Sequence, residues 1–193
     1  MKILFGGTFD PVHNGHVTAV RSIRSAFPDD RIIVMPAYVN PFKVGMKQGA
    51  DSAQRLKMCE LAFSDIADCI VSDHEISNAG VSYTIDTLRM LSSDGSKVAL
   101  AVGADSLRSL DKWRSSEEIF RDHEVIALRR DSSPIEEDIM QLESLGAKIH
   151  LIGSEPFVIS STELRQRIGA GEDISGFVPP AVVSYITRNG IYK

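Results

Sequence analysis

Short apolar runs alternate along this chain with stretches of helical periodicity, and that alternation limits the folds open to it. The runs lie at residues 2–5, 31–35, 67–72, 97–102, 124–128 and 148–152. Helical patterns between them cover residues 17–27, 52–63, 83–92, 115–121 and 135–145. Strands separated by helices are typical of βαβ units with parallel strands. Because such crossovers are right-handed, the pattern predicts an α/β, Rossmann-like, doubly wound and mainly parallel sheet.

The end of the chain differs from this pattern. Two short helical patterns, at 161–168 and 179–187, occur there without a clear strand. A linker rich in Pro, Gly or Ser does not precede them. We therefore expect a small helical C-terminal part, from about residue 155 to 193, packed on one domain that spans residues 1–193.

Composition excludes several classes of partner. The 26 Asp and Glu outnumber the 21 Lys and Arg, which argues against a nucleic-acid clamp. Residues 131–147 hold five acids and no Lys or Arg, so this stretch accounts for the whole excess. An apolar run of about 18 residues, as a membrane helix needs, is missing from the sequence. Cys59 and Cys69 are expected to be reduced thiols, which predicts a cytoplasmic protein. Together these observations predict that the protein has no membrane or nucleic-acid partners.

The turn after the first apolar run carries the most unusual residues of the chain. Residues 6–16 read GGTFDPVHNGH. The two glycines allow the backbone to approach a ligand, and a loop that enters a helix offers N–H groups to anions. His13 and His16 are three residues apart at the expected helix start, which places both rings on one face. Without a third strong metal ligand nearby, phosphate binding is favoured over metal binding, and we name no metal ligand.

These residues resemble a known signature. The run matches the G-x-F-D-P-x-H-x-G-H pattern of the H-x-G-H nucleotidyltransferase superfamily. Further stretches resemble its pyridine-nucleotide branch, the bacterial nicotinate-mononucleotide adenylyltransferases, and occur in family order. They are PAYVNPFK at 36–43, SYTIDTL at 82–88, GAD at 103–105 followed by Trp113, and ISSTELR at 159–165.

The resemblance implies a reaction. Members of this family join ATP, with Mg²⁺, to nicotinate mononucleotide, giving nicotinate adenine dinucleotide and pyrophosphate. The mononucleotide phosphate attacks the α-phosphate of ATP, so catalysis consists mainly of positioning and charge stabilisation. We therefore expect an enzyme of NAD biosynthesis with two small-molecule substrates.

The resemblance also assigns residues, one motif at a time. The expected catalytic residues are His13, His16, Lys43 and Arg165. ATP would be bound by His16 and Arg165 together with Gly6, Gly7, Thr8, Phe9, Gly103, Asp105, Ser160, Ser161 and Thr162. Nicotinate mononucleotide would be bound by Thr8, Tyr83, Thr84, Asp105, Trp113 and Arg114. Ser160 also begins a capping-box pattern with Glu163.

Alternatives remain open from the sequence. The acceptor could be nicotinamide mononucleotide, phosphopantetheine or a polyol phosphate, or the chain could bind nucleotides without catalysis. A tRNA-handling protein is disfavoured by the chain length and the lack of a basic excess. Phe42 stands where the family commonly has histidine, so its ring can pack on a ligand but cannot hydrogen-bond to it. The sequence is compatible with a homo-oligomer.

Overall fold

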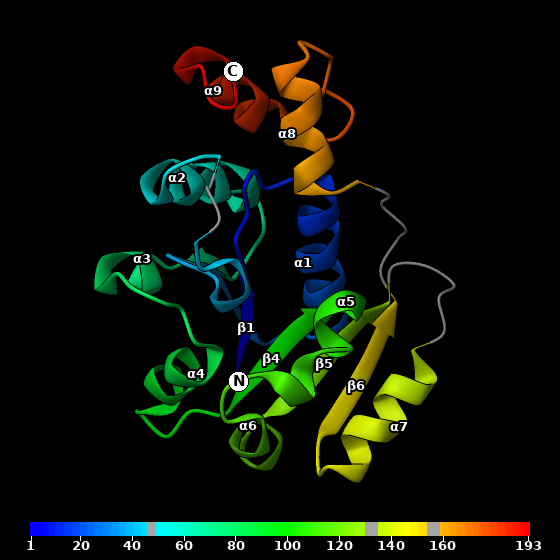
Figure 1. The fold of residues 1–193 in the computed structure, drawn as a ribbon. Helices are drawn as coiled ribbons and strands as arrows, with labels where there is room; N and C mark the ends of the chain where they lie inside the picture. The colour runs from blue at the N-terminus through cyan, green and yellow to red at the C-terminus, as the bar shows by residue number, and fades with distance from the viewer. Residues whose placement is uncertain (46–48, 130–134, 154–158) are drawn as a thin grey trace.

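The apolar runs form one parallel sheet at the centre of the molecule (Figure 1). The structure is a computed structural model that describes residues 1–45, 49–129, 135–153 and 159–193. Its strands are β1 (Lys2–Gly7), β2 (Arg31–Pro36), β3 (Cys69–Val71), β4 (Val98–Gly103), β5 (Glu124–Arg129) and β6 (Lys148–Gly153). They run in the order β3-β2-β1-β4-β5-β6. The predicted doubly wound α/β class is confirmed, and the order reverses between β1 and β4.

Helices connect these strands. They are α1 (Asn14–Ala26), α2 (Ser52–Phe63), α3 (His74–Asn78), α4 (Thr84–Ser92), α5 (Ala104–Leu107), α6 (Ser116–Asp122), α7 (Glu136–Ser144), α8 (Ser161–Gly169) and α9 (Pro180–Asn189). The described residues also form two short 3₁₀ turns, η1 (Pro41–Lys43) and η2 (Leu110–Lys112). The sequence patterns did not predict α3 and α5, which span five and four residues and are too short to show a helical period.

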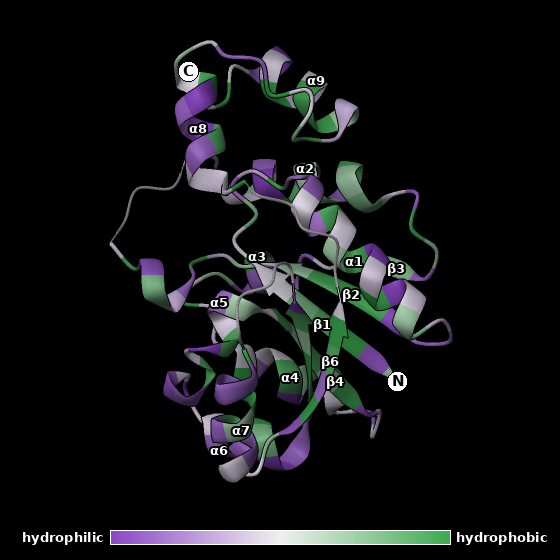
Figure 2. Ribbon diagram, turned by 90° about the vertical axis from the view of Figure 1, so that its right-hand side faces the viewer, coloured by the Kyte–Doolittle hydropathy of each residue, from purple (hydrophilic) through white to green (hydrophobic). Residues whose placement is uncertain are grey.

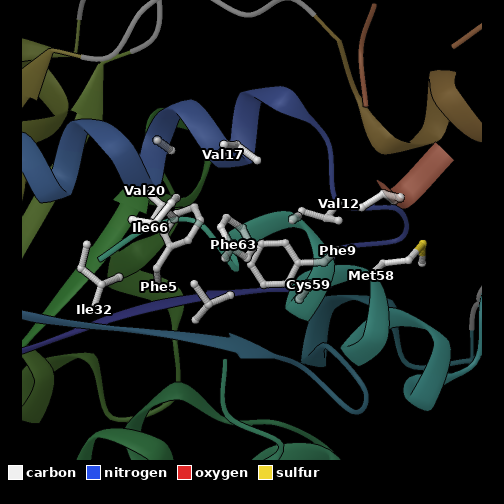
Figure 3. Packing of buried hydrophobic residues seen from close by; sticks show 14 of the residues in the cluster. Phe5, Phe9, Val12, Val17, Val20, Ile32, Met58, Cys59, Phe63 and Ile66 are labelled. Atoms are coloured by element: carbon white, nitrogen blue, oxygen red, sulfur yellow. The ribbon is translucent and has the colours of Figure 1, made fainter. Parts of the chain in front are cut away.

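Neighbouring residues of each strand point to opposite faces of the sheet, and helices cover both faces (Figure 2). Ile3 and Phe5 of β1 pack with α1 and α2, as the close view shows for Phe5 (Figure 3). Leu4, between them, packs with α4 and α6 on the other face. Because these strands are covered on both sides, they read as continuous apolar runs rather than as alternating ones.

The C-terminal helices join the first of these two layers. Leu164 of α8 and Val182 and Ile186 of α9 are buried in the same cluster as α1 and α2. Figure 1 shows α8 beyond the upper end of α1, and α9 above α2, on the side of the sheet where the strands finish. These helices are therefore placed next to the turn between β1 and α1.

The acidic stretch lies partly within α7. Glu136, Glu137 and Glu143 are exposed on this helix, as expected for a solvated face, whereas residues 131–134 lie outside the described part. Residues 154–158, where the helical C-terminal part was expected to begin, also lie outside it. Among the described helices, none combines the length and apolar character needed to cross a membrane.

Candidate active site

A cavity of about 960 Å³ opens where the strand order reverses. Its floor is formed by the carboxyl ends of β1 and β4, and its walls by η1, the start of α4, and the segment from α5 through η2 to Trp113. Ligands of doubly wound sheets bind in this kind of crevice, outside the carboxyl ends of the strands. The volume is at the upper end of the range for small-molecule sites.

The structure brings most of the predicted site residues together around this cavity. Those that line it are Gly6, Gly7, Thr8, His16, Lys43, Tyr83, Thr84, Gly103, Asp105, Trp113 and Arg114. The predicted residues that lie outside its lining are His13, Phe9, Ser160, Ser161, Thr162 and Arg165. Within the second group, His13 and Phe9 contact His16, whereas the residues at the start of α8 contact the β1–α1 turn or one another.

His16 is the histidine that faces the cavity. It lies in the first turn of α1, and its Nδ1 accepts a hydrogen bond from the backbone N–H of His13 at 3.2 Å. Because Nδ1 is an acceptor here, the proton of the neutral ring is placed on Nε2. Nε2 is thus the nitrogen with which this ring can donate to a ligand.

His13 and Phe9 support His16 from behind. The His13 ring lies 3.7 Å from the His16 ring, centroid to centroid, and is buried. The Phe9 ring packs edge-on to His16 at 4.9 Å and points into the hydrophobic core beside Phe63 (Figure 3). Only glycine fits at position 7, because a Cβ there would come within 2.9 Å of the Phe9 ring. Any contact of Phe9 with ATP would therefore involve its backbone.

Part of the cavity lining is aromatic. The ring centroids of Trp113 and Phe42 lie 6.4 Å apart with the ring planes tilted by 50°, and Phe42 is 58% exposed. Tyr83 and Thr84 form the beginning of α4, whose first N–H groups have no acceptor within the helix. The guanidinium of Arg114 lies 4.5 Å from the centre of the Tyr83 ring and 3.7 Å from a carboxylate oxygen of Asp86. A flat ring that bears a carboxylate matches these surroundings.

The first turn of α8 contacts the β1–α1 turn rather than the cavity. Ser161 donates a hydrogen bond from Oγ to the carbonyl of Pro11 at 3.0 Å, and Arg165 donates one to the carbonyl of Asp10 at 2.7 Å. The predicted cap is present, since Ser160 Oγ accepts from the Glu163 N–H at 3.1 Å, while the Glu163 carboxylate binds Arg167. Arg165 also acts on Lys43. The pKa of Lys43 is lowered, chiefly because its ammonium group is partly buried and next because the positive charge of Arg165 is nearby.

Arg55 is a supporting residue that the sequence analysis missed. It is fully buried and donates hydrogen bonds to the carbonyls of Thr8 at 2.8 Å, Ala37 at 2.6 Å and Tyr38 at 3.0 Å. It therefore holds together the two loops that follow β1 and β2. The sequence does contain a signal for it. Arg55 lies three residues before Met58, at a position where the helical period of α2 predicts a buried side chain.

Glu75 is a second residue that no motif indicated. It lines the cavity beside Ser82 and accepts a hydrogen bond from Thr87 Oγ1. Burial raises the pKa of the Glu75 carboxyl, although the bonds from Thr87 and Ser82 act in the opposite direction. The folded protein thus favours the neutral form of this group more than the unfolded chain does.

We expect Glu75→Gln to become more stable relative to the unchanged protein as the pH rises. A carboxyl whose pKa is raised on folding contributes most below its ordinary pKa of 4.5, and that contribution is lost as the pH passes through the raised pKa. Urea unfolding from pH 4 to pH 8 measures the difference in free energy between the two proteins. Glu117→Gln, at an exposed site on α6, is the control. If the difference in the free energy of unfolding between the two proteins stayed constant with pH, the raised pKa of the buried Glu75 carboxyl would be contradicted.

Comparison with known proteins agrees with this geometry. A crevice at the strand-order switch, lined by glycines, a histidine and cations, suits the phosphates of a nucleotide, and the relatives of this chain are nucleotidyltransferases. The chain belongs to the cytidylyltransferase-like family, whose sequence profile matches residues 4–167.

The branch of that family follows from its relatives. A probable nicotinate-nucleotide adenylyltransferase of Roseiflexus sp. (strain RS-1) is 36% identical over 98% of this chain and 96% of its own. One from Citrobacter koseri is 34% identical over 100% of this chain and 99% of its own. The resemblance drawn from the motifs is confirmed.

A solved structure shares the fold. Plasmodium falciparum nicotinic acid mononucleotide adenylyltransferase complexed with NaAD superposes with a TM-score of 0.83 over 99% of this chain and 96% of its own. The two sequences are 20% identical, so this likeness concerns the arrangement of the elements.

Proposed function

We propose that this protein transfers the adenylyl group of ATP to nicotinate mononucleotide, forming nicotinate adenine dinucleotide and releasing pyrophosphate. One observation carries the proposal: a single cavity is lined both by cationic and N–H donors suited to phosphate and by aromatic side chains beside the start of a helix. His16 and Lys43 belong to the first set, and Trp113 and the start of α4 to the second. The full-length similarity to adenylyltransferases of this kind supports the same reaction.

The chemistry needs positioned charge rather than a protein nucleophile. An oxygen of the mononucleotide phosphate attacks the α-phosphorus of ATP, and the bond from that phosphorus to the β-phosphate oxygen breaks. Pyrophosphate leaves with the electron pair of that bond. His16 would donate from Nε2 to an α-phosphate oxygen, where negative charge grows in the transition state. His13 would hold the orientation of the His16 ring through its backbone N–H.

The pyridine end would select the acceptor. Trp113 would offer a flat face for the nicotinate ring, with Phe42 as the neighbouring aromatic side chain. The N–H groups at the start of α4 would receive the carboxylate, and Arg114 adds positive charge beside them. The neutral amide of nicotinamide mononucleotide gains less from this charge, so we expect the acid to be preferred.

The phosphates beyond the α-position would extend toward α8. Lys43 lines the cavity on that side and is close enough to Arg165 for the two charges to interact. The first turn of α8 offers N–H groups and hydroxyls, and is tied to the β1–α1 turn by Ser161 and Arg165. These groups suit the β- and γ-phosphates.

Magnesium would enter with ATP as part of the substrate. Among the described residues there is no group of three or more His, Cys, Asp or Glu that could hold a metal ion. Mg²⁺ keeps several waters and readily binds through phosphate oxygens, so it needs no such protein site here. We also propose that the enzyme acts in the cytoplasm, where Cys59 and Cys69, both free, remain reduced.

The acceptor can be tested with the two mononucleotides. We expect kcat/KM for the acid to exceed that for the amide by about 100-fold, since one charge-assisted contact of roughly 3 kcal/mol distinguishes them. Pyrophosphate release measured with each mononucleotide, at fixed MgATP, gives the ratio. A preference for the amide would overturn the choice of acceptor, and no release with either would favour a nucleotide-binding protein without catalysis.

A further inference from the structure

The carboxylate of Asp10 connects four separate segments of the chain behind the proposed phosphate site. It is 5% exposed and lies in the turn between β1 and α1. Oδ1 accepts hydrogen bonds from the Ala50 N–H at 2.9 Å and from the Tyr192 hydroxyl at 2.8 Å. Oδ2 accepts from the Gly49 N–H at 2.9 Å and lies 3.9 Å from Arg165 Nη1. Both carboxylate oxygens therefore accept hydrogen bonds in the folded protein.

Tyr192, the residue before the C-terminal Lys193, is held in an unusual conformation at this point. Its φ of 69° is in the left-handed region, which an aromatic residue rarely adopts without compensating contacts. Its ring and the stem of Arg165 pack directly on Gly49, where a Cβ would come within 2.6 Å of the ring and 2.7 Å of Arg165 Cδ. The end of the chain is thus fitted against the segment that precedes α2.

Arg165 depends on the same turn for its position. It donates to the carbonyl of Asp10 at 2.7 Å and to Thr162 Oγ1 at 3.2 Å, and 30% of its side chain remains exposed. Lys43 is close to both Arg165 and Asp10, whose charges shift its pKa in opposite directions. Asp10 therefore lies among the cations Lys43, Arg55 and Arg165.

We propose that Asp10 and Tyr192 form a latch that positions Arg165 for the phosphates of ATP. Tyr192 is a positioning residue in this account, since it acts through Asp10 and Arg165 rather than by touching substrate. The inference rests on the proposed function, because it assumes that Arg165 meets phosphate. It assigns a role in ATP binding to the last turn of the chain, 182 residues from Asp10 in sequence.

Tyr192→Phe tests the latch because it removes one hydroxyl and keeps the ring. Arg165 would keep its hydrogen bond to the carbonyl of Asp10, but the carboxylate 3.9 Å from its guanidinium would have lost one of the partners that fix it. We expect the Kd and KM for MgATP to rise about five-fold, the effect of one hydrogen bond, with those for nicotinate mononucleotide unchanged within two-fold. ATP binding is measured by calorimetry, and mononucleotide binding by the fluorescence of Trp113, the only tryptophan in the chain.

Tyr185→Phe is the matched control, since Tyr185 lies in α9 and packs against the same hydrophobic cluster. It should leave both affinities unchanged. Unchanged MgATP affinity in Tyr192→Phe would overturn the latch. An equal loss of affinity for both substrates together with a lower Tm would also overturn it, because that result indicates a general structural role. If the unaltered protein binds no MgATP, the proposed function itself fails, and this result is distinct from the other two.

Discussion

His16→Ala is expected to lower kcat for dinucleotide formation by about 100-fold or more, the usual effect of removing a donor aimed at transition-state charge. His16 lines the cavity, and its Nδ1 is occupied by the N–H of His13. Nε2 is therefore fixed as the donor, and no other described histidine lines the cavity to replace it. The KM values for both substrates should change much less than kcat, since the loss concerns the transition state.

Initial rates of pyrophosphate release measure this effect, with circular dichroism and Tm as checks on folding. His150→Ala is the control, because His150 lies on the edge strand β6 and pairs with Glu124 at 2.8 Å. That variant should retain normal activity. Activity of His16→Ala within a few-fold of the unaltered protein would remove His16 from the mechanism.

Arg55→Met is expected to have the largest effect on stability. The substitution keeps an apolar stem but removes the donor to the buried carbonyl of Ala37 and to the partly buried carbonyls of Thr8 and Tyr38. An unsatisfied buried acceptor costs about 1–3 kcal/mol, so we expect a loss of about 3–5 kcal/mol in the free energy of unfolding. At about 2–4 °C per kcal/mol for a chain of this size, Tm should fall by about 10 °C.

Urea and thermal unfolding measure this loss. Arg21→Met is the matched control, since Arg21 on α1 has 61% of its side chain exposed and pairs only with Asp65 among the described residues. Breaking such a surface pair should cost less than about 1 kcal/mol. Equal effects of the two substitutions would contradict the role of Arg55 in joining the loops that form the cavity.

The fold could be predicted closely because each central strand is a continuous apolar run that ends at a turn. The helix expected at 52–63 has those bounds in the structure, as α2. β3 is shorter than the run at 67–72 because Asp68 adopts a left-handed backbone with φ of 50° and because β3 pairs only with β2. Periodicity detects the apolar run but cannot show where pairing stops.

The site could be predicted only as far as its motifs reach. The glycines after β1 and β4, His16 and Trp113 line one cavity because parallel strands end at the same edge of the sheet. The separate position of His13, behind His16 rather than in the cavity, depends on the packing of α1 and Phe9. The contact of Tyr192 with Asp10 depends on how the last helices fold back, which no local pattern records.

One measurement tests the central claim, adenylyl transfer from ATP to the phosphate of nicotinate mononucleotide, most directly. The protein is incubated with the mononucleotide and with ATP labelled at either the α- or the γ-phosphate. The account predicts that the α-label appears in nicotinate adenine dinucleotide and the γ-label in pyrophosphate, with neither bound to the protein. Release of the γ-label as inorganic phosphate, or α-label attached covalently to the protein, would contradict direct transfer within this cavity.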